Sequence, residues 1–245
     1  RWQVDRVVVH PQSDQGLGVV VHGLDSGEPI TPTSQPVLLK QEEQRLMGVL
    51  PELLEAFPAL KQEVNGRPLV YLDSAATTQK PQAVIDAIVH YYQHDNANVH
   101  RAAHALSGRA TSAFEDSRRV TAEFLGCANP AQIIWVRGVT EAINLVAASW
   151  GRSNLAAGDK VLVSAMEHHS DIVPWQLICA ERGAEVLPVP VTDDGEIDLQ
   201  ALDALLDERV KMVAVNHVSN ALGTINPVQE IAAKAHAVGA LCMVD

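Results

Sequence analysis

The second half of the sequence alternates short apolar runs with amphipathic, helix-like stretches. The runs consist mostly of Val, Ile, Leu and Ala without strict polar alternation, which is typical of strands buried on both faces. Such alternation predicts an α/β fold with right-handed βαβ units and a mostly parallel sheet. The expected strands are Ile133–Val136, Lys160–Ala165, Glu185–Val191, Lys211–Val215 and Ala240–Asp245. The expected helices between them are Thr140–Trp150, Ile172–Arg182, Leu199–Glu208 and Pro227–Val238.

The first part of the chain has a different character. Two strand-like runs, Trp2–Val9 and Leu17–Leu24, precede a stretch rich in Pro, Ser, Thr and Gly that is typical of a linker. A helix is expected over Gln41–Phe57 and a short strand over Leu69–Leu72. Further helices are expected from Pro81 onward and over Ser107–Leu125. These patterns divide the chain into a β-rich extension with linker (1–36), a helix and connecting segment (37–80) and a large domain (81–245).

Composition excludes several classes of protein. The chain carries 18 Lys and Arg against 30 Asp and Glu, a formal net charge of -12, which argues against nucleic-acid binding. No apolar run is long enough to cross a membrane. The three cysteines, Cys127, Cys179 and Cys242, lie far apart in the sequence. An odd number without metal-like spacing favours a reducing, cytoplasmic compartment, with Cys179 and Cys242 expected as buried packing residues.

Polar residues follow four of the expected strands. Thr140 lies in the turn Arg137–Glu141, and His168 follows the strand that ends at Ala165. Asn220 follows Lys211–Val215, and Asp245 ends the last apolar run. Ligands of open α/β sheets bind at the carboxyl ends of the strands, so these side chains are expected at one edge.

Each of these residues also has an ordinary interpretation. Thr140 is a common helix-capping residue, and His168 with His169 could be solvated loop histidines or, with less support, metal ligands. Taken together, the four strand-end residues would supply one ligand with a phosphate-binding helix start, an aromatic stacking partner, a hydrogen-bond donor and a carboxylate. These groups suit pyridoxal 5'-phosphate (PLP), whose pyridinium nitrogen pairs with an Asp.

From about Leu53 to Asp245 the sequence resembles the group II cysteine desulfurases of the SufS/CsdA type, which belong to the class-V aminotransferases. The resemblance implies the aspartate-aminotransferase-like fold (fold type I), and residues 81–245 as its PLP-binding large domain. The runs that carry it are Tyr71-Leu72-Asp73-Ser74-Ala75-Ala76, Val99-His100-Arg101, Arg137-Gly138-Val139-Thr140-Glu141, Met166-Glu167-His168-His169, His217-Val218-Ser219-Asn220-Ala221-Leu222-Gly223 and Met243-Val244-Asp245.

The resemblance implies roles for these positions. His168 would stack on the PLP ring and transfer protons, and Asp245 would keep the pyridine nitrogen protonated. Asn220 would lie beside the cofactor's 3-hydroxyl and the substrate carboxylate. The phosphate would be bound by Gly138, Val139 and Thr140, and the substrate pocket would be bordered by Ala75, Ala76 and His100. Val139 departs from the family, which commonly has a second Thr there.

Two family residues have no counterpart in this sequence: the Schiff-base lysine and the nucleophilic cysteine. The chain is therefore expected to be an N-terminal portion, inactive by itself and at best a weak binder of PLP. For the full-length protein the resemblance implies release of L-alanine from L-cysteine, with the sulfur passing as an enzyme persulfide to an acceptor protein of iron–sulfur cluster assembly. It also implies a cytoplasmic homodimer.

Alternatives remain open at this point. L-selenocysteine is a possible substrate, since the boundary to selenocysteine lyases is soft. Other fold type I PLP enzymes, such as kynureninase-like enzymes or small aminotransferases, share the architecture. A third alternative is a non-catalytic binding or scaffold fragment, which the missing lysine would favour if the protein were naturally this short.

Overall fold

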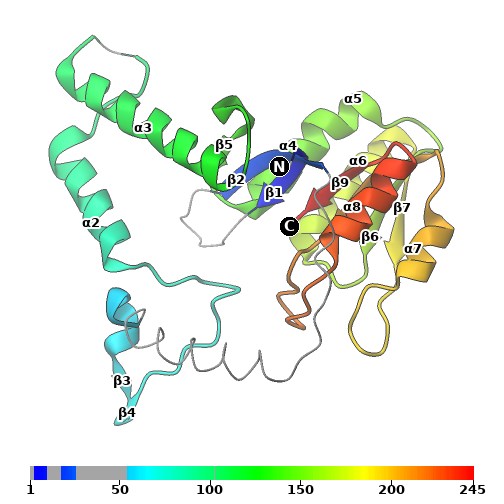
Figure 1. Ribbon diagram of the computed structural model, residues 1–245, viewed down its shortest axis with the longest axis horizontal. Helices are drawn as coiled ribbons and strands as arrows, with labels where there is room; N and C mark the ends of the chain where they lie inside the picture. Colours follow the sequence, from blue (N-terminus) through cyan, green and yellow to red (C-terminus); the bar gives the residue numbers. More distant parts are fainter. Residues whose placement is uncertain (1–2, 10–17, 26–53, 102) are drawn as a thin grey trace. The chain divides into compact units, whose positions relative to one another are not determined.

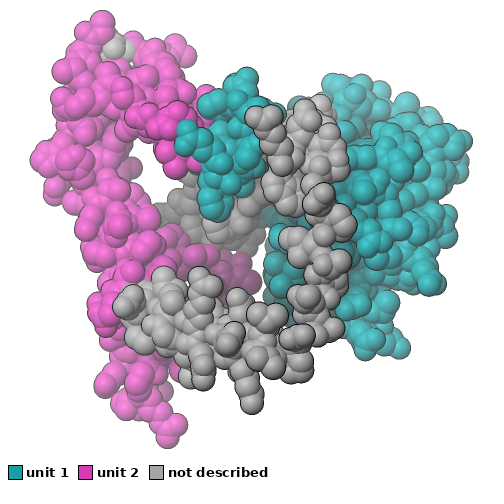
Figure 2. Space-filling model, in the orientation of Figure 1, with its two compact units in different colours: residues 1–26, 121–245 teal, residues 27–120 magenta. Residues whose placement is uncertain are grey.

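The fold is that of a computed structural model, which describes residues 3–9, 18–25, 54–101 and 103–245 (Figure 1). The chain divides into two compact units, coloured separately in Figure 2. Unit 1 comprises residues 1–26 and 121–245, and unit 2 comprises residues 27–120. The division into 1–36, 37–80 and 81–245 remains a prediction.

A four-stranded parallel sheet forms the centre of unit 1. Its strands, in spatial order, are β7 (Glu185–Val189), β6 (Lys160–Ser164), β8 (Val210–Val215) and β9 (Leu241–Val244). All three neighbouring pairs are parallel, which confirms the predicted α/β class and mostly parallel sheet. The observed strands begin or end within two residues of the expected ones, because continuous β-branched runs favour one structure.

Alternate residues of these strands enter two separate cores, one on each face of the sheet. Val161, Val163 and Met212 pack against α4 and α6, whereas Leu162 and Val213 pack against α7 and α8. The helices of unit 1 are α4 (Val139–Val146), α5 (Arg152–Asn154), α6 (Val173–Arg182), α7 (Leu199–Leu205) and α8 (Val228–Ala237). Shorter helical turns are η3 (Pro130–Gln132), η4 (Ala147–Gly151) and η5 (His169–Asp171). Unit 1 therefore has three layers, with the sheet in the middle.

Local sequence explains where these helices begin and end. The Asp198 carboxylate accepts the backbone N–H groups of Gln200 and Ala201, at 3.0 and 2.9 Å, and so caps the start of α7. Gly183 follows α6 in the left-handed conformation, with φ of 71°, as expected for the glycine after a helix. The α7 helix is shorter than the predicted Leu199–Glu208, because Leu206 already has extended backbone.

One predicted strand lies in a different sheet. β5 (Ile134–Val136) pairs antiparallel with β2, so the prediction that Ile133–Val136 joins the parallel sheet is wrong. β2 (Gly18–Asp25) pairs in turn with β1 (Gln3–Val9), which confirms the two strands predicted near the N-terminus. The three-stranded sheet has the order β1-β2-β5, and β1 lies beside β9. A strand of three residues carries too little pattern to specify its partner.

Unit 2 has less regular structure. Its described elements are η1 (Pro58–Lys61), β3 (Glu63–Val64), β4 (Arg67–Pro68), α2 (Gln82–His90), η2 (Tyr91–Asp95) and most of α3 (Ala105–Phe124). Asn65 and Gly66 both have positive φ, 54° and 70°, and form a tight hairpin turn between β3 and β4. The predicted strand Leu69–Leu72 is wrong, since β4 ends at Pro68 and residues 69–72 form no strand. The predicted helix Gln41–Phe57 lies largely outside the described residues.

Candidate functional site

The carboxyl ends of β6, β8 and β9 lie side by side at one edge of the parallel sheet (Figure 1). Val215 pairs with Val244, and the Asp245 backbone N–H donates to the Val215 carbonyl at 2.9 Å. The His217 N–H donates to the Asp245 carbonyl at 2.7 Å, which fixes the segments leaving β8 and β9. This edge carries three of the polar segments singled out from the sequence.

Asp245 is a partly buried acid directly after β9. Burial raises the pKa of its carboxyl above the ordinary value, while the charge of a protonated His168 lowers it. Its charged form is therefore favoured by a nearby cation. The two side chains are thus close enough for their charges to interact, and their role in binding a cofactor remains a prediction.

The imidazole of His168 is held by its own loop. Its Nδ1 accepts the backbone N–H of Ser170 at 3.2 Å and lies 2.8 Å from the Ser170 hydroxyl. Because Nδ1 accepts, the proton of the neutral ring is assigned to Nε2. The side chain is otherwise exposed, so the ring face and Nε2 are open to a ligand.

Helix α4 packs against η5, the helical turn that follows His168. Gly138 precedes the helix, and the first helical hydrogen bond runs from the Ala142 N–H to the Gly138 carbonyl, at 3.1 Å. The backbone N–H groups before Ala142 have no acceptor inside the helix, and the exposed Thr140 adds a hydroxyl. The side chain of Val139 is buried in the core, so only its backbone could contact a phosphate.

Glu141 links the two ends of the turn Arg137–Glu141. Its carboxylate accepts the Arg137 backbone N–H at 2.7 Å and pairs with the Arg137 guanidinium at 3.0 Å. The guanidinium holds the pKa of Glu141 below its usual range.

Asn220 lies in the loop after β8, where the loop folds back and Val218 pairs with Ile225. The Ser219 hydroxyl is buried and accepts the Leu222 N–H at 3.1 Å, which shapes this turn. Asn220 itself is exposed. Its place beside a cofactor remains a prediction.

The predicted substrate-side residues belong to unit 2, whereas the strand ends belong to unit 1. Ala75 and Ala76 are exposed in a loop. His100 has a positive φ of 63°, unusual for a side chain of this size, and its Nε2 lies 2.9 Å from Glu115 Oε1. The expectation that these residues border one pocket with Asn220 remains a prediction.

Sequence reasoning missed two buried acids at the same edge, Glu167 and Asp171. Both are in a polar segment that reads as a solvated loop, and the sequence offers no cation nearby. The spacing to Trp175, four residues after Asp171, was the available signal, because a buried indole N–H needs an acceptor. The Trp175 Nε1–H donates to Asp171 Oδ1 at 2.9 Å.

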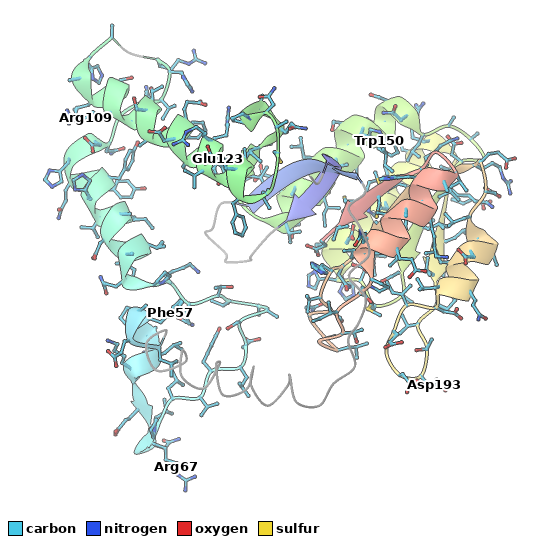
Figure 3. The ribbon with its side chains drawn as sticks, in the orientation of Figure 1. Phe57, Arg67, Arg109, Glu123, Trp150 and Asp193 are labelled. Carbon is cyan, nitrogen blue, oxygen red and sulfur yellow. The ribbon has the colours of Figure 1, made fainter. Side chains whose placement is uncertain are left out.

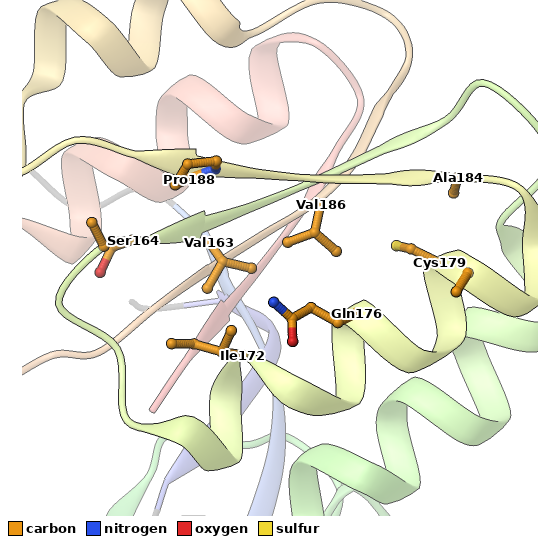
Figure 4. A pocket seen from close by; sticks show the side chains of 10 residues that line it. Val163, Ser164, Ile172, Gln176, Cys179, Ala184, Val186 and Pro188 are labelled. Carbon is orange, nitrogen blue, oxygen red and sulfur yellow. The ribbon is translucent and has the colours of Figure 1, made fainter.

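A cavity of about 400 Å³ lies between α6 and strands β6 and β7 (Figure 4). Its lining is mostly apolar and includes Val163, Val186 and Gln176. Ser164 and Ala165, at the carboxyl end of β6, also line it, so the cavity begins beside the strand-end edge. Thr140, His168, Asn220 and Asp245 are not among its lining residues.

The cysteines are packing residues, as predicted for Cys179 and Cys242. Burial raises the pKa of these two thiols to about 11 and about 12, so neither is a thiolate near neutral pH. Cys127 is half-buried, and burial raises its pKa too. Among the described residues no cluster of His, Cys, Asp and Glu could hold a metal ion, and no helix is long and apolar enough to span a membrane.

The sequence pattern of the aminotransferase class-V family matches residues 70–245. The chain belongs to the aminotransferase class-V family. It is 54% identical over 189 residues to a probable cysteine desulfurase of Vibrio cholerae, covering 77% of this chain and 47% of that protein. It is 55% identical over 189 residues to a cysteine desulfurase of Dickeya dadantii, covering 77% of this chain and 46% of that protein. The chain thus spans about half the length of these curated relatives.

Solved structures of class-V enzymes resemble the fold. The cysteine desulfurase CsdA of Escherichia coli superposes with a TM-score of 0.69 at 35% identity, covering 80% of this chain and 48% of that one. The apo cysteine desulfurase of Thermococcus onnurineus gives a TM-score of 0.72 at 35% identity, covering 80% and 46%. These likenesses confirm the predicted fold type I architecture.

Class-V aminotransferases and cysteine desulfurases depend on PLP, and the strand-end site fits this cofactor. Burial destabilises the charged form of Asp245, so this carboxylate is suited to pair with a protonated ring nitrogen. The unpaired N–H groups at the start of α4, with Thr140, suit a phosphate. The exposed His168 offers a ring face for stacking.

Proposed function

We propose that this chain is the cofactor-binding part of a PLP-dependent cysteine desulfurase, which takes sulfur from L-cysteine and leaves L-alanine. The observation that carries the proposal is the site at the ends of β6 and β9, where His168 and Asp245 interact. Relatives named cysteine desulfurase, 54% and 55% identical over 189 residues, support the same activity.

Bound PLP supplies an electron sink that weakens the bonds to the substrate's α-carbon. Asp245 would hold a proton on the ring nitrogen by charge pairing, which would strengthen that sink. The N–H groups at the start of α4 and the Thr140 hydroxyl would bind the phosphate, and Asn220 would bind the 3-hydroxyl and the substrate carboxylate.

His168 would pack its ring against the cofactor. Because Nδ1 accepts the Ser170 N–H, its exchangeable proton in the neutral ring is on Nε2. The side chain can therefore donate a proton from Nε2, whereas a role as base first needs that proton to leave. His100 has a left-handed backbone, and its ring lies beside Glu115. By likeness to the family, His100 would border the substrate.

The wider setting belongs to the same proposal. The released sulfur passes as a persulfide to an acceptor protein of iron–sulfur cluster assembly, in a cytoplasmic homodimer. The lysine that carries the cofactor and the nucleophilic cysteine of this family have no counterpart among the six lysines and three cysteines of residues 1–245. We therefore expect these residues by themselves to release no sulfide.

The test uses the full-length protein loaded with PLP. L-cysteine should give equal amounts of alanine and, with a reductant, sulfide. A PLP-bound protein that is inert to cysteine would contradict the proposal, and one that acts only on selenocysteine would identify a selenocysteine lyase. The 245-residue chain treated with PLP and borohydride is the matched control: no single lysine should be labelled stoichiometrically.

A further inference from the structure

Two acids are buried together beneath the loop that carries His168. Glu167 is 8% exposed and Asp171 is fully buried. They flank the segment His168-His169-Ser170, with Glu167 just before it and Asp171 just after it. Burying two carboxylates side by side costs free energy unless donors or a proton neutralise them.

Each carboxyl has one oxygen that is well supplied with donors. Glu167 Oε1 accepts from the Ser164 hydroxyl, from the Asn216 backbone N–H at 2.8 Å and from Asn216 Nδ2 at 3.0 Å. Asp171 Oδ1 accepts the Trp175 indole N–H at 2.9 Å. The second oxygens, Glu167 Oε2 and Asp171 Oδ2, are both buried and receive no donor from the described residues.

A single shared proton would satisfy both of these unpaired oxygens. The side chains of Glu167 and Asp171 lie within hydrogen-bonding reach, but two carboxylates have no proton to place between them. If one carboxyl is protonated, its O–H donates to the other, and both orphaned oxygens are satisfied. In the described part of the chain, neither oxygen accepts a hydrogen bond from any other group.

The surroundings of the pair favour the uptake of a proton. Asp245, directly after β9, adds negative charge near both acids, and in the described part of the chain no Lys or Arg pairs with either. Besides Asp245 and His168, the facing groups are Ser164 and Asn216 on Glu167, Trp175 of α6 and Cys242 of β9. Burial raises the pKa of Glu167 to about 7 and that of Asp171 well above its ordinary value.

We propose that Glu167 and Asp171 share one proton and act as a positioning pair for His168. The shared hydrogen bond ties the two ends of the His168 loop to each other. Inside the loop, the Asp171 N–H donates to the His168 carbonyl at 2.8 Å, and the Ser170 N–H donates to His168 Nδ1. Loss of the proton leaves two facing carboxylates, which loosens the loop and the imidazole it presents.

The pair also makes the site sensitive to pH. A carboxyl whose pKa is raised in the folded state holds its proton between its unfolded pKa, near 4.5, and its folded pKa, about 7. The native state binds the extra proton in this window, so stability is greatest below it and is lost as pH rises through 7. That His168 serves a cofactor rests on the proposed function, whereas the shared proton does not.

Trp175 is a built-in reporter of the proton. It is one of four tryptophans, and its indole N–H binds Asp171 directly. Nitrogen–proton correlation spectra of the 245-residue chain, without PLP, should show the Trp175 indole signal moving with a midpoint near pH 7. A Trp175→Phe variant assigns the signal. An indole signal that is constant from pH 5.5 to 9 would overturn the proposal.

Isosteric variants separate the shared proton from simple packing. Asp171→Asn keeps the acceptor for Trp175 and supplies a permanent N–H donor to Glu167. We expect the pH step of the indole to vanish in this variant, and its urea midpoint to stay level from pH 5.5 to 8.5 where that of the wild type falls. Glu167→Gln should do the same, and a step that persists in both variants contradicts the shared proton.

The matched control is Asp193→Asn, since Asp193 is an exposed acid at a loop tip (Figure 3). This variant should keep the wild-type step and the wild-type fall in midpoint. In the PLP-loaded full-length protein, Asp171→Asn should shift the alkaline limb of the pH–activity profile, with KM for cysteine little changed. If only the enzyme assay fails, the proposed function is contradicted. If only the Trp175 indole signal stays constant with pH, the shared proton is contradicted.

Discussion

The two units of this chain differ in how they cover their apolar side chains. In unit 1, the strands of the parallel sheet place apolar residues in cores on both faces: Val161 on one face and Leu162 on the other are both 0% exposed. In unit 2, helix α2 has the apolar spacing predicted from the sequence, but its Ile85 and Ile88 are 36% and 52% exposed, and Tyr92 in the following η2 is 68% exposed. Unit 1 therefore has the packing to stabilise itself, whereas the apolar face of α2 is not covered by the described residues.

The largest expected effect comes from Trp175, a fully buried side chain of unit 1. Trp175→Ala removes its packing against the α6 side of the sheet and leaves Asp171 without a donor. We expect a loss of about 3–5 kcal/mol of unfolding free energy in urea titrations, typical of large-to-small changes in a core. A loss below about 1 kcal/mol, in the range of surface changes, would mean that unit 1 is not the stable unit.

A smaller effect is expected at the start of α7. Asp198→Ala removes the acceptor for the Gln200 and Ala201 N–H groups. Loss of such a cap costs about 0.5–2 kcal/mol. Asp198→Asn, which keeps a capping oxygen, is the control and should recover most of the stability by the same urea titration.

The ion pair between Lys160 and Asp207 should stabilise the fold less than the α7 cap does, and only at pH values where Asp207 is charged. Their atoms Nζ and Oδ2 are 2.7 Å apart, and the Lys160 ammonium lowers the pKa of Asp207 to about 2. A lowered pKa stabilises the fold above the unfolded value of 3.8, and this contribution is lost as pH falls toward 2. Asp207→Asn should therefore lower the urea midpoint slightly at pH 7, and the gap to wild type should narrow between pH 4 and pH 3.

The smallest effect is expected in unit 2. Ile88→Ala shortens a half-exposed side chain of α2 and should change the unfolding free energy by no more than about 0.5 kcal/mol. A loss of more than about 2 kcal/mol would indicate that α2 is packed in solution, and the contrast between the two units would fail.

The strands of the parallel sheet were predicted best, because several neighbouring residues of each strand carry the same apolar signal. β6, β8 and β9 were placed to within two residues because each is a continuous apolar run between helices. The partner of β5 was not predictable, since three residues fit a parallel or an antiparallel neighbour equally well. The strand expected at Leu69–Leu72 failed because the Asn65-Gly66 turn directs pairing to the residues on either side of it.

The candidate site was predictable in part. His168 and Asp245 could be assigned to one edge because parallel strands bring their carboxyl ends together. Glu167 and Asp171 were missed because burial of an acid depends on long-range packing, here Asn216 from β8 and Trp175 from α6. No local pattern distinguishes such acids from those of a solvated loop.

The central claim is that the ends of β6 and β9 hold PLP, with Asp245 on its ring nitrogen. The most direct test is the dissociation constant of PLP for the full-length protein, with Asp245→Ala compared with Asp193→Asn. Asp245→Ala should weaken binding about tenfold or more, about 1.4 kcal/mol, while Asp193→Asn leaves it unchanged. Equal affinity of the Asp245→Ala variant and the wild type would contradict the account.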